Sequence, residues 1–293
     1  MKSVSIAIPT LARPSLKDVL RSLAAQKYPH SLDVELLIAD DGPTLSAREL
    51  VAEVSLPFPV KMLEVCAQNI AVARNACLSA AKGDFLLFID DDEIAGETWI
   101  ADMAQQMEET GADCLFAPVQ PVYQPSAPDW VTKLNPLFPG EIRTSLKAET
   151  VVGRTGNSAI RMAFVHKNNL EFDTRYRLQG EDLFFFNQCA KAGADMRAVS
   201  HPAVMENVRP QQHQFKNIVK SLFRRGYVYA DVQFRCDHQR LRVKTYLIGT
   251  SLVKIAVAGL ALPVSPLAGP TMVAKQIFSL ALDFGKMKRV IFG

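Results

Sequence analysis

The stretch that decides the fold is LLFIDDDEI, residues 86–94, in which four apolar residues run directly into three aspartates. A short apolar run of this kind predicts a buried strand. Three adjacent carboxyl groups repel one another, and carboxylate oxygens are the ligands that hard divalent cations prefer. The stretch therefore predicts a buried strand whose carboxyl end either binds a cation or forms a solvated acidic loop.

The first 120 residues alternate between apolar runs and helical patterns. The predicted strands are 4–9, 34–39, 60–65, 85–89 and 113–119, and the predicted helices are 15–26, 46–54, 70–81 and 98–109. This alternation predicts βαβ units on a mostly parallel sheet, an α/β fold that binds ligands beyond the carboxyl ends of its strands. The residues where three of the runs end are mostly polar, and we expect them to meet at one edge. They are Pro9, Thr10, Asp40, Asp41 and Asp90–Asp92.

The middle of the chain is less regular. Residues 120–150 are rich in proline and predict a long surface loop that contacts substrate. Trp130 in this loop either stacks on a sugar ring or packs the loop. Residues 158–164 predict a strand, 180–193 a helix and 211–235 a basic helix.

The C-terminal tail is apolar but interrupted by prolines. Its two apolar runs, 247–262 and 271–282, are each shorter than the roughly 20 residues of a membrane span. Residues 240–293 carry eight Lys or Arg side chains against Asp283 alone. This pattern predicts two short helices in a membrane interface, with packing on the protein core as the alternative.

Composition limits the class of protein. With 293 residues, 48% apolar and 22% charged, the chain is ordinary globular material, and a net charge of +3 gives no argument for a nucleic-acid partner. The five cysteines form no C-x-x-C pair, which indicates reduced thiols. A strand that begins at Val4 leaves no room for a signal peptide. We expect a cytoplasmic protein attached peripherally to the inner face of the cell membrane.

Three acidic groups carry the chemistry. Asp90–Asp92 would hold Mg²⁺ or Mn²⁺ at a diphosphate, or else belong to an acidic loop that caps the next helix through Glu93 and Glu97. One of the two carboxylates of Asp40 and Asp41 would accept a hydrogen bond from an N–H group of a nucleotide base. Alternatively, these residues form an Asx turn. Asp182, in an apolar context, suits a general base, or else a helix N-cap.

Four motifs, in order, resemble family 2 glycosyltransferases of the GT-A fold. They are SIAIPTLARP (5–14), LLIADDG (36–42), ARNACLSAAKGDFLLFIDDDE (73–93) and GED (180–182). TGNSAI (155–160), ENVRPQQ (206–212) and the broken apolar tail resemble bacterial glucosyltransferases of the succinoglycan type, which extend lipid-linked exopolysaccharide repeat units. The resemblance covers residues 4 to 230.

Carried over residue by residue, the resemblance implies a binding site for a nucleotide-sugar donor. Pro9, Thr10 and Asp41 would contact the nucleotide base. Asp90 and Asp91 would lie near the ribose and the diphosphate.

The resemblance also implies the catalytic and metal residues. Asp92, the last residue of the DXD motif, would ligate Mn²⁺ or Mg²⁺. Asp182 would be the base, with Glu181 beside it. His201 or His213 would be a third metal ligand in this picture, or else a structural histidine.

By this resemblance the chain is an inverting, metal-dependent hexosyltransferase that moves a sugar, from UDP-glucose or another UDP-sugar, to a lipid-diphosphate-linked saccharide. Residues 1–120 would bind the nucleotide sugar, 121–235 would hold the acceptor and the base, and 236–293 would form the basic helical extension. FRRGY at 223–227 replaces the Q-x-x-R-W of processive members, which favours addition of one sugar. The alternatives are a nucleotidyltransferase, whose glycine-rich phosphate loop is missing, and an inactive membrane-associated binding protein.

Overall fold

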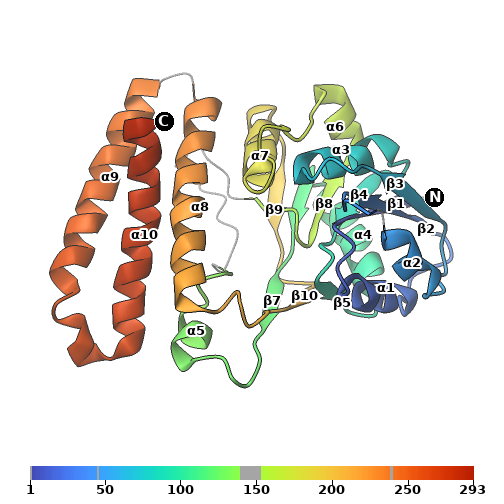
Figure 1. Cartoon of the computed structure of the whole chain (residues 1–293). Coiled ribbons are helices and arrows are strands. Elements are labelled where there is room, and N and C mark those ends of the chain that lie inside the picture. The colour runs from blue at the N-terminus through green and yellow to red at the C-terminus, as the bar shows by residue number, and fades with distance from the viewer. Residues whose placement is uncertain (1, 45, 139–152, 238–239) are drawn as a thin grey trace. The chain divides into compact units, whose positions relative to one another are not determined.

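The computed structural model describes residues 2–44, 46–138, 153–237 and 240–293 (Figure 1). The chain divides into two compact units, each described below by itself. The first unit comprises Met1–Gln120 and Glu141–Glu206, and the second comprises Pro121–Gly140 and Asn207–Gly293.

A seven-stranded sheet in the order β3-β2-β1-β4-β8-β6-β9 forms the centre of the first unit. Its strands are β1 Ser3–Thr10, β2 Asp33–Asp40, β3 Val60–Glu64, β4 Phe85–Phe88, β6 Cys114–Phe116, β8 Ser158–Arg161 and β9 Met196–Ala198. A second sheet has the order β5-β10-β7, with β5 Glu93–Ala95, β7 Val119–Val122 and β10 Val204–Asn207. The helices of the first unit are α1 Leu16–Ala24, α2 Ala47–Ala52, α3 Ile70–Ala80, α4 Trp99–Thr110, α6 Met162–Asn168 and α7 Glu181–Lys191.

Parallel pairing in the main sheet follows the predicted βαβ order. Ile6 of β1 lies between Leu36 of β2 and Leu87 of β4, and both pairs are parallel. β8 is antiparallel to both β4 and β6. The α/β fold with a mostly parallel sheet is thus confirmed, and the carboxyl ends of β1, β2 and β4 meet at one edge.

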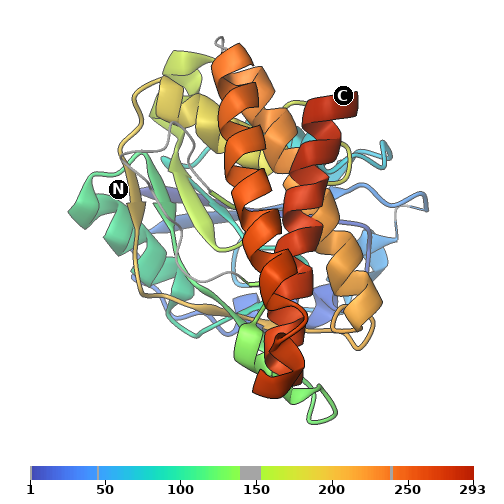
Figure 2. The same cartoon turned by 90° about the vertical axis from the view of Figure 1, so that its left-hand side faces the viewer.

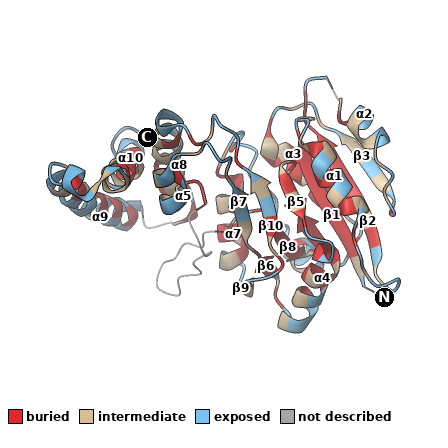
Figure 3. Cartoon of the chain, turned by 90° about the horizontal axis from the view of Figure 1, so that it is seen from below, coloured by how far each residue is buried: buried red, intermediate tan, exposed pale blue. Residues whose placement is uncertain are grey.

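The two faces of the sheet bury separate cores because successive strand residues point to opposite sides. Leu36 and Leu87 pack on one face with Leu20 of α1 and Met103 of α4. The other face packs α3 and α7, through side chains such as Ala73, Cys77, Phe185 and Phe186. Figure 3 shows β1 and β2, inside this sheet, mostly in the colour of buried residues, whereas the edge strand β3 has none.

Three predictions for residues 113–164 differ from the structure. The run 113–119 is two strands, because β6 ends at Phe116 and β7 begins at Val119. The run 158–164 is a strand only to Arg161, and Met162 already starts α6. The loop expected at 120–150 contains part of β7 and helix α5, Asp129–Leu134, within its described part, while residues 139–150 lie outside the described residues.

The second unit is built mainly from three long helices, α8 Phe215–Cys236, α9 Arg240–Ala261 and α10 Pro270–Phe292, with a short 3₁₀ helix η1, Ser265–Ala268. Figure 2 shows α9 in orange beside α10 in red. Both helices are longer than the predicted apolar runs. Helix α9 starts seven residues before the run at 247, and α10 continues to Phe292, beyond the run that ends at 282. Among the described residues α9 alone has the length and composition to cross a membrane, and 22% of its apolar window is buried.

Two glycines let α8 and α10 touch through their backbones. A Cβ on Gly285 would lie 1.9 Å from the Phe223 carbonyl oxygen, and one on Gly226 would lie 1.9 Å from the Leu282 carbonyl oxygen. Asp283 of α10 accepts a hydrogen bond from Ser251 of α9 at 3.1 Å and so joins those two helices.

Candidate active site

A cleft of about 590 Å³ lies in the first unit at the predicted edge of the sheet. This volume falls within the range of about 300–1,000 Å³ usual for small-molecule sites. The predicted residues that line it are Pro9, Thr10, Asp41, Asp90, Asp91, Asp92 and Glu181. Sequence reasoning did not assign a role to its other lining residues, which include Arg13, Gln68, Arg74 and Arg177.

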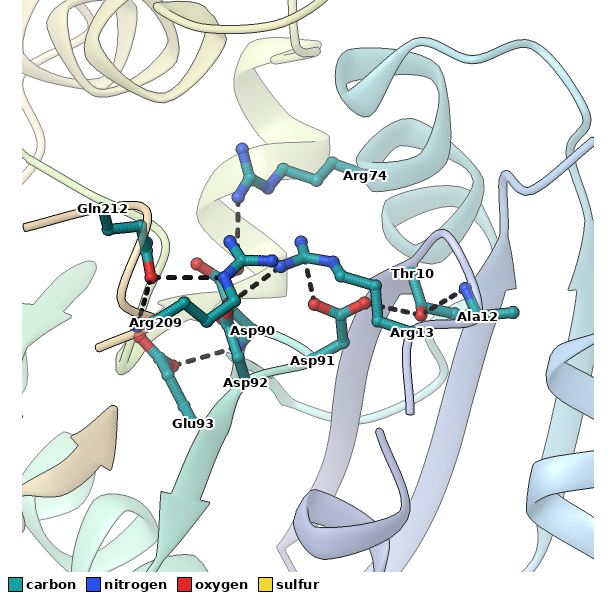
Figure 4. A network of polar contacts seen from close by, with 10 residues as sticks. All are labelled: Thr10, Ala12, Arg13, Arg74, Asp90, Asp91, Asp92, Glu93, Arg209 and Gln212. Carbon is teal, nitrogen blue, oxygen red and sulfur yellow. Dashed lines mark hydrogen bonds and ion pairs between the residues drawn. The ribbon is translucent and has the colours of Figure 1, made fainter. Parts of the chain in front are cut away.

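Arg13 connects the end of β1 to the aspartates that follow β4. Its guanidinium lies 3.0 Å from Asp91 Oδ1 and donates to Asp92 Oδ2 at 2.8 Å (Figure 4). Thr10 donates its hydroxyl to Asp91 Oδ2 at 2.7 Å. Burial raises the pKa of Asp91 to about 6, although Arg13 and Thr10 act in the opposite direction. The loop after β1 therefore positions the acidic cluster.

Arg74 of α3 is buried and connects the acidic cluster to α7. It donates a hydrogen bond to Glu181 and lies 3.3 Å from Asp90 Oδ1. Burial lowers the pKa of Arg74, but Glu181 and Asp90 raise it further, so the guanidinium stays charged. Arg74 is the single charged residue of the helix IAVARNACLSA, a signal that could have drawn attention to it but does not name its partners.

Glu93 is a buried part of the site that the sequence analysis placed in an acidic cap. It lies in β5 and accepts a hydrogen bond from the Asp90 N–H at 2.9 Å, whereas α4 begins only at Trp99. Burial raises the pKa of Glu93 well above its usual value. A Cβ on Gly156 would lie 2.4 Å from Glu93 Oε1, so the glycine of TGNSAI makes room for this carboxyl group. The capping alternative is wrong for Glu93.

Asp40 and Asp41 both bind the backbone. Asp40 accepts from the Gly42 N–H at 3.0 Å, as in the Asx turn, and from the Ala47 N–H at 2.8 Å. Asp41 accepts from the N–H groups of the loop before α3, at 2.7 Å from Ala67 and Gln68 and at 2.6 Å from Asn69. Only Asp41 of the pair lines the cleft. Its Oδ1 already accepts two N–H groups, whereas Oδ2 accepts one and keeps a second lone pair for a ligand.

The two acids of GED differ in their surroundings. Glu181 is buried, pairs with Arg74 and lines the cleft, and burial raises its pKa to about 7. Asp182 is half-buried and accepts from the Leu183 N–H at 2.7 Å. Burial also raises the pKa of Asp182. Both carboxyl groups thus have pKa values shifted toward neutral pH, as a general base requires.

The cleft suits a divalent cation in charge and in ligand type. Its lining has five carboxyl groups against three guanidinium groups. Within the described ranges no three Asp, Glu, His or Cys side chains converge as a complete metal site. This does not argue against Mg²⁺ or Mn²⁺, because Mg²⁺ is usually held by one or two carboxylates together with substrate phosphates.

The remaining predicted residues have other surroundings. His201 pairs with Asp102 of α4 at 2.9 Å, and Asp102 does not line the cleft. His213 belongs to the second unit and is buried. Trp130 packs in the second unit against Phe215, with ring centroids 5.6 Å apart, as the packing alternative predicted.

Known proteins share both the sequence and the fold. The family model described as "Glycosyl transferase family 2" matches residues 5–170. The succinoglycan biosynthesis protein ExoM of Rhizobium meliloti is 31% identical over 234 residues, which cover 77% of this chain and 74% of that protein. The poly(ribitol-phosphate) beta-N-acetylglucosaminyltransferase TarS of Staphylococcus aureus is 28% identical over 147 residues, 46% of this chain and 25% of TarS.

Solved structures share the GT-A fold at low sequence identity. TarS 1-349 in complex with UDP-GlcNAc superposes with a TM-score of 0.55 at 19% identity, over 98% of this chain and 91% of that one. The mannosyltransferase PcManGT of Pyrobaculum calidifontis, in complex with GDP-Man and Mn²⁺, superposes with a TM-score of 0.61 at 17% identity, over 98% and 87%. The crystallised TarS chain is longer, and this chain spans 55% of it.

Proposed function

The chain belongs to glycosyltransferase family 2, and on that premise we propose that it transfers one sugar from a UDP-sugar to a lipid-diphosphate-linked saccharide, with inversion at the anomeric carbon. One observation carries this proposal. Arginine and aspartate side chains from three strand ends line a single cleft together with the acid that opens α7.

The proposed donor site follows the cleft. Pro9, Thr10 and Asp41 contact the nucleotide base, and Asp90 and Asp91 lie near the ribose and the diphosphate. The three guanidinium groups of the cleft offer charge-assisted hydrogen bonds to phosphate oxygens. Membership of the family favours this function over a nucleotidyltransferase.

Asp92, with Asp90 beside it, would hold Mn²⁺ or Mg²⁺. Asp92 faces the cleft and carries a carboxylate, the ligand type that these ions take. A bound ion would neutralise charge on the departing diphosphate. Of these two carboxylates, Asp92 pairs with Arg13, 2.8 Å from Oδ2, and Asp90 pairs with Arg74.

Asp182 acts as the general base in this proposal, with Glu181 beside it. The hydroxyl oxygen of the acceptor bonds to the anomeric carbon while the bond from that carbon to the diphosphate oxygen breaks. The hydroxyl proton passes to Asp182, and UDP leaves. No covalent sugar–enzyme intermediate is needed, so one base suffices.

We further propose a cytoplasmic protein held peripherally at the inner membrane face by α9 and α10. Exposed apolar side chains on α9 support this, including Val253, Val257 and Leu260, with exposed fractions of 63%, 61% and 81%. The eight cationic residues of 240–293 would add attraction to anionic lipids.

The test is transfer by the full chain from UDP-glucose, UDP-GlcNAc or GDP-mannose to a lipid-diphosphate disaccharide, with Mn²⁺ or with EDTA. We expect metal-dependent release of UDP and a product of inverted anomeric configuration by NMR. Asp182→Asn keeps the shape of the side chain but not its basicity, so kcat should fall by about 10²–10⁴-fold while the donor Kd is unchanged.

Glu181→Gln is the matched variant at the neighbouring acid. If Glu181→Gln loses kcat and Asp182→Asn does not, the base is Glu181. Binding of UDP without transfer or hydrolysis of any donor would mean an inactive binding protein.

A further inference from the structure

The second unit contains an apolar groove that the proposed chemistry does not use. The groove has a volume of about 1060 Å³ and is lined by α8, α9 and α10. Ile277, Leu280 and Phe284 contribute from α10, Phe223 from α8 and Leu252 from α9. All of these residues belong to the second unit, so the groove is complete within it.

The groove is elongated. Its α10 residues recur at helical spacing from Ile277 to Phe292. With a rise of about 1.5 Å per residue, this face of α10 is roughly 22 Å long. A long apolar groove fits an extended hydrocarbon chain better than a compact ligand.

The spacing of the helices is fixed by contacts beside the groove. Gly226 and Gly285 bring α8 and α10 into backbone contact, and Ser251 and Lys286 both bind the buried carboxylate of Asp283, at 3.1 and 2.7 Å. These contacts hold α10 to α8 on one side and to α9 on the other. The groove is thus a built feature of the helix packing.

Every charged residue that lines the groove is a lysine. Lys216 and Lys220 are exposed and one turn apart on α8, and Lys288 of α10 lies 5.8 Å from the ring centroid of Phe223. Residues four positions apart lie on the same face of a helix, so Lys216 and Lys220 can bind one anion together. Lysine ammonium groups are common ligands of phosphate.

The charge also argues against a second copy of this chain as the occupant. Pairing this face with itself would bring lysines against lysines, and no lining residue is acidic. An occupant of complementary chemistry has a hydrocarbon chain and an anionic head. The outer face of α9 is itself apolar and exposed (Figure 3), which suits an occupant that comes from a lipid layer.

We propose that this groove holds the hydrocarbon chain of the lipid-diphosphate acceptor, with Lys216 and Lys220 binding its diphosphate. This deepens the proposed function and rests on it, since it names the part of the chain that recognises the lipid.

The test uses farnesyl diphosphate, a short prenyl diphosphate, titrated calorimetrically into the full chain in nanodiscs of neutral phosphatidylcholine, with empty discs subtracted. Farnesyl diphosphate should bind at least about tenfold more tightly than inorganic diphosphate, because only it fills the apolar groove. Dioleoylphosphatidylglycerol should bind more weakly than farnesyl diphosphate.

Two matched pairs of variants locate the site. Leu252→Trp fills the groove and should weaken binding about tenfold, whereas Leu241→Trp, also exposed on α9 but outside the groove, should change it less than about twofold. Lys216→Gln with Lys220→Gln should weaken binding similarly, whereas Lys254→Gln, exposed on α9 and outside the groove, should not.

Several results would overturn the assignment. Inorganic diphosphate that binds as well as farnesyl diphosphate would mean an ion site only. Equal binding of phosphatidylglycerol would mean a general contact with membrane lipid. A dimer that Leu252→Trp dissociates would mean that a second copy covers the groove.

UDP binding in the same samples separates this inference from the proposed function. A protein that binds UDP but not farnesyl diphosphate keeps its donor site and loses the groove assignment. A protein that binds farnesyl diphosphate but not UDP retains the groove as a lipid site and contradicts the proposed transferase reaction.

Discussion

Arg74 donates a hydrogen bond to Glu181, a residue 107 positions later in the chain, and both side chains are at least nine-tenths buried. The same guanidinium lies 3.3 Å from Asp90 Oδ1. A single buried cation therefore joins the strand end that carries the aspartate cluster to the helix that carries GED. The proposed donor residues of the cleft and the helix that begins at Glu181 share this one arginine.

Arg74→Met should destabilise the first unit strongly. It leaves Glu181 buried without its cationic partner, and breaking a buried ion pair in this way typically costs about 3–5 kcal/mol. Urea unfolding at neutral pH measures the loss. Arg48→Met is the control, because Arg48 pairs with Glu64 at 3.2 Å on the exposed surface and such pairs contribute about 0–1 kcal/mol. Equal losses in the two variants would show that the Arg74 contacts are not stabilising.

Glu181 should make the unliganded protein less stable as the pH rises. Burial raises its pKa from 4.5 to about 7, so between these values the folded state binds more protons than the unfolded state. Stability is then full below about pH 4.5 and falls by roughly 3 kcal/mol as the pH rises through about 7.

Glu181→Gln removes this titration. Arg74 keeps Asp90 as a partner in this variant, so its charge is not left unpaired. The variant should therefore match the wild type near about pH 5 and exceed it in free energy of unfolding at about pH 8. Urea melts at the two pH values measure the difference, with Glu49→Gln, an exposed residue of α2, as the control. A Gln variant that keeps the wild-type slope would mean that Glu181 is already ionised at low pH.

Much of this site could be predicted from sequence because its residues follow strands. The run 85–89 had to be buried, so the aspartates after it had to lie at the sheet edge. Asp40 and Asp41 illustrate the limit, because both follow the same strand and only the fold shows that Asp41 alone faces the cleft. Arg13 and Arg74 were not identified, since their partners are distant in sequence and no local pattern pairs them.

The C-terminal helices could be predicted only in part. Apolar runs showed where α9 and α10 lie, but Arg240–Tyr246 extends α9 with residues that hydropathy reads as polar. The contact between α8 and α10 depends on Gly226 and Gly285, which are separated by a further helix. A glycine within a helix has no sequence signal that tells a close backbone approach from a weak point.

Asp92→Ala should abolish the metal dependence of UDP binding and leave the fold intact. Asp92 lines the cleft, and its pairing with Arg13 is partly buried there rather than in the apolar core. Calorimetry with UDP should give a lower Kd in Mn²⁺ than in EDTA for the wild type and equal values for the variant. Asp129→Ala, at an exposed residue of α5, should behave as the wild type. A variant that retains the Mn²⁺ effect would place the ion on other ligands.

Gly285→Ala should separate α8 from α10. The added Cβ would lie 1.9 Å from a backbone oxygen of Phe223, which a side-chain rotation cannot relieve. Overpacking of this kind costs about 1–3 kcal/mol or more. Gly249→Ala, in α9 with nothing within 4 Å of its Cβ, should instead be stabilising by up to about 1 kcal/mol. Thermal unfolding of the full chain compares the two, and a neutral Gly285→Ala would mean that the helices do not touch there.

The exposed face of α9 should govern membrane attachment without affecting donor binding. Val253, Val257 and Leu260 are more than half exposed, and each apolar side chain buried in a lipid layer contributes up to about 1.5–3 kcal/mol. Replacing all three by glutamine should therefore abolish flotation with vesicles of phosphatidylcholine and phosphatidylglycerol. Lys254→Gln, on the same helix, should weaken flotation only by the roughly 1 kcal/mol of one interfacial cation. UDP binding should be unchanged in both variants, because every residue of the proposed donor site belongs to the first unit. If the triple variant floats as well as the wild type, α9 does not contact the membrane, and its apolar face must be covered by protein.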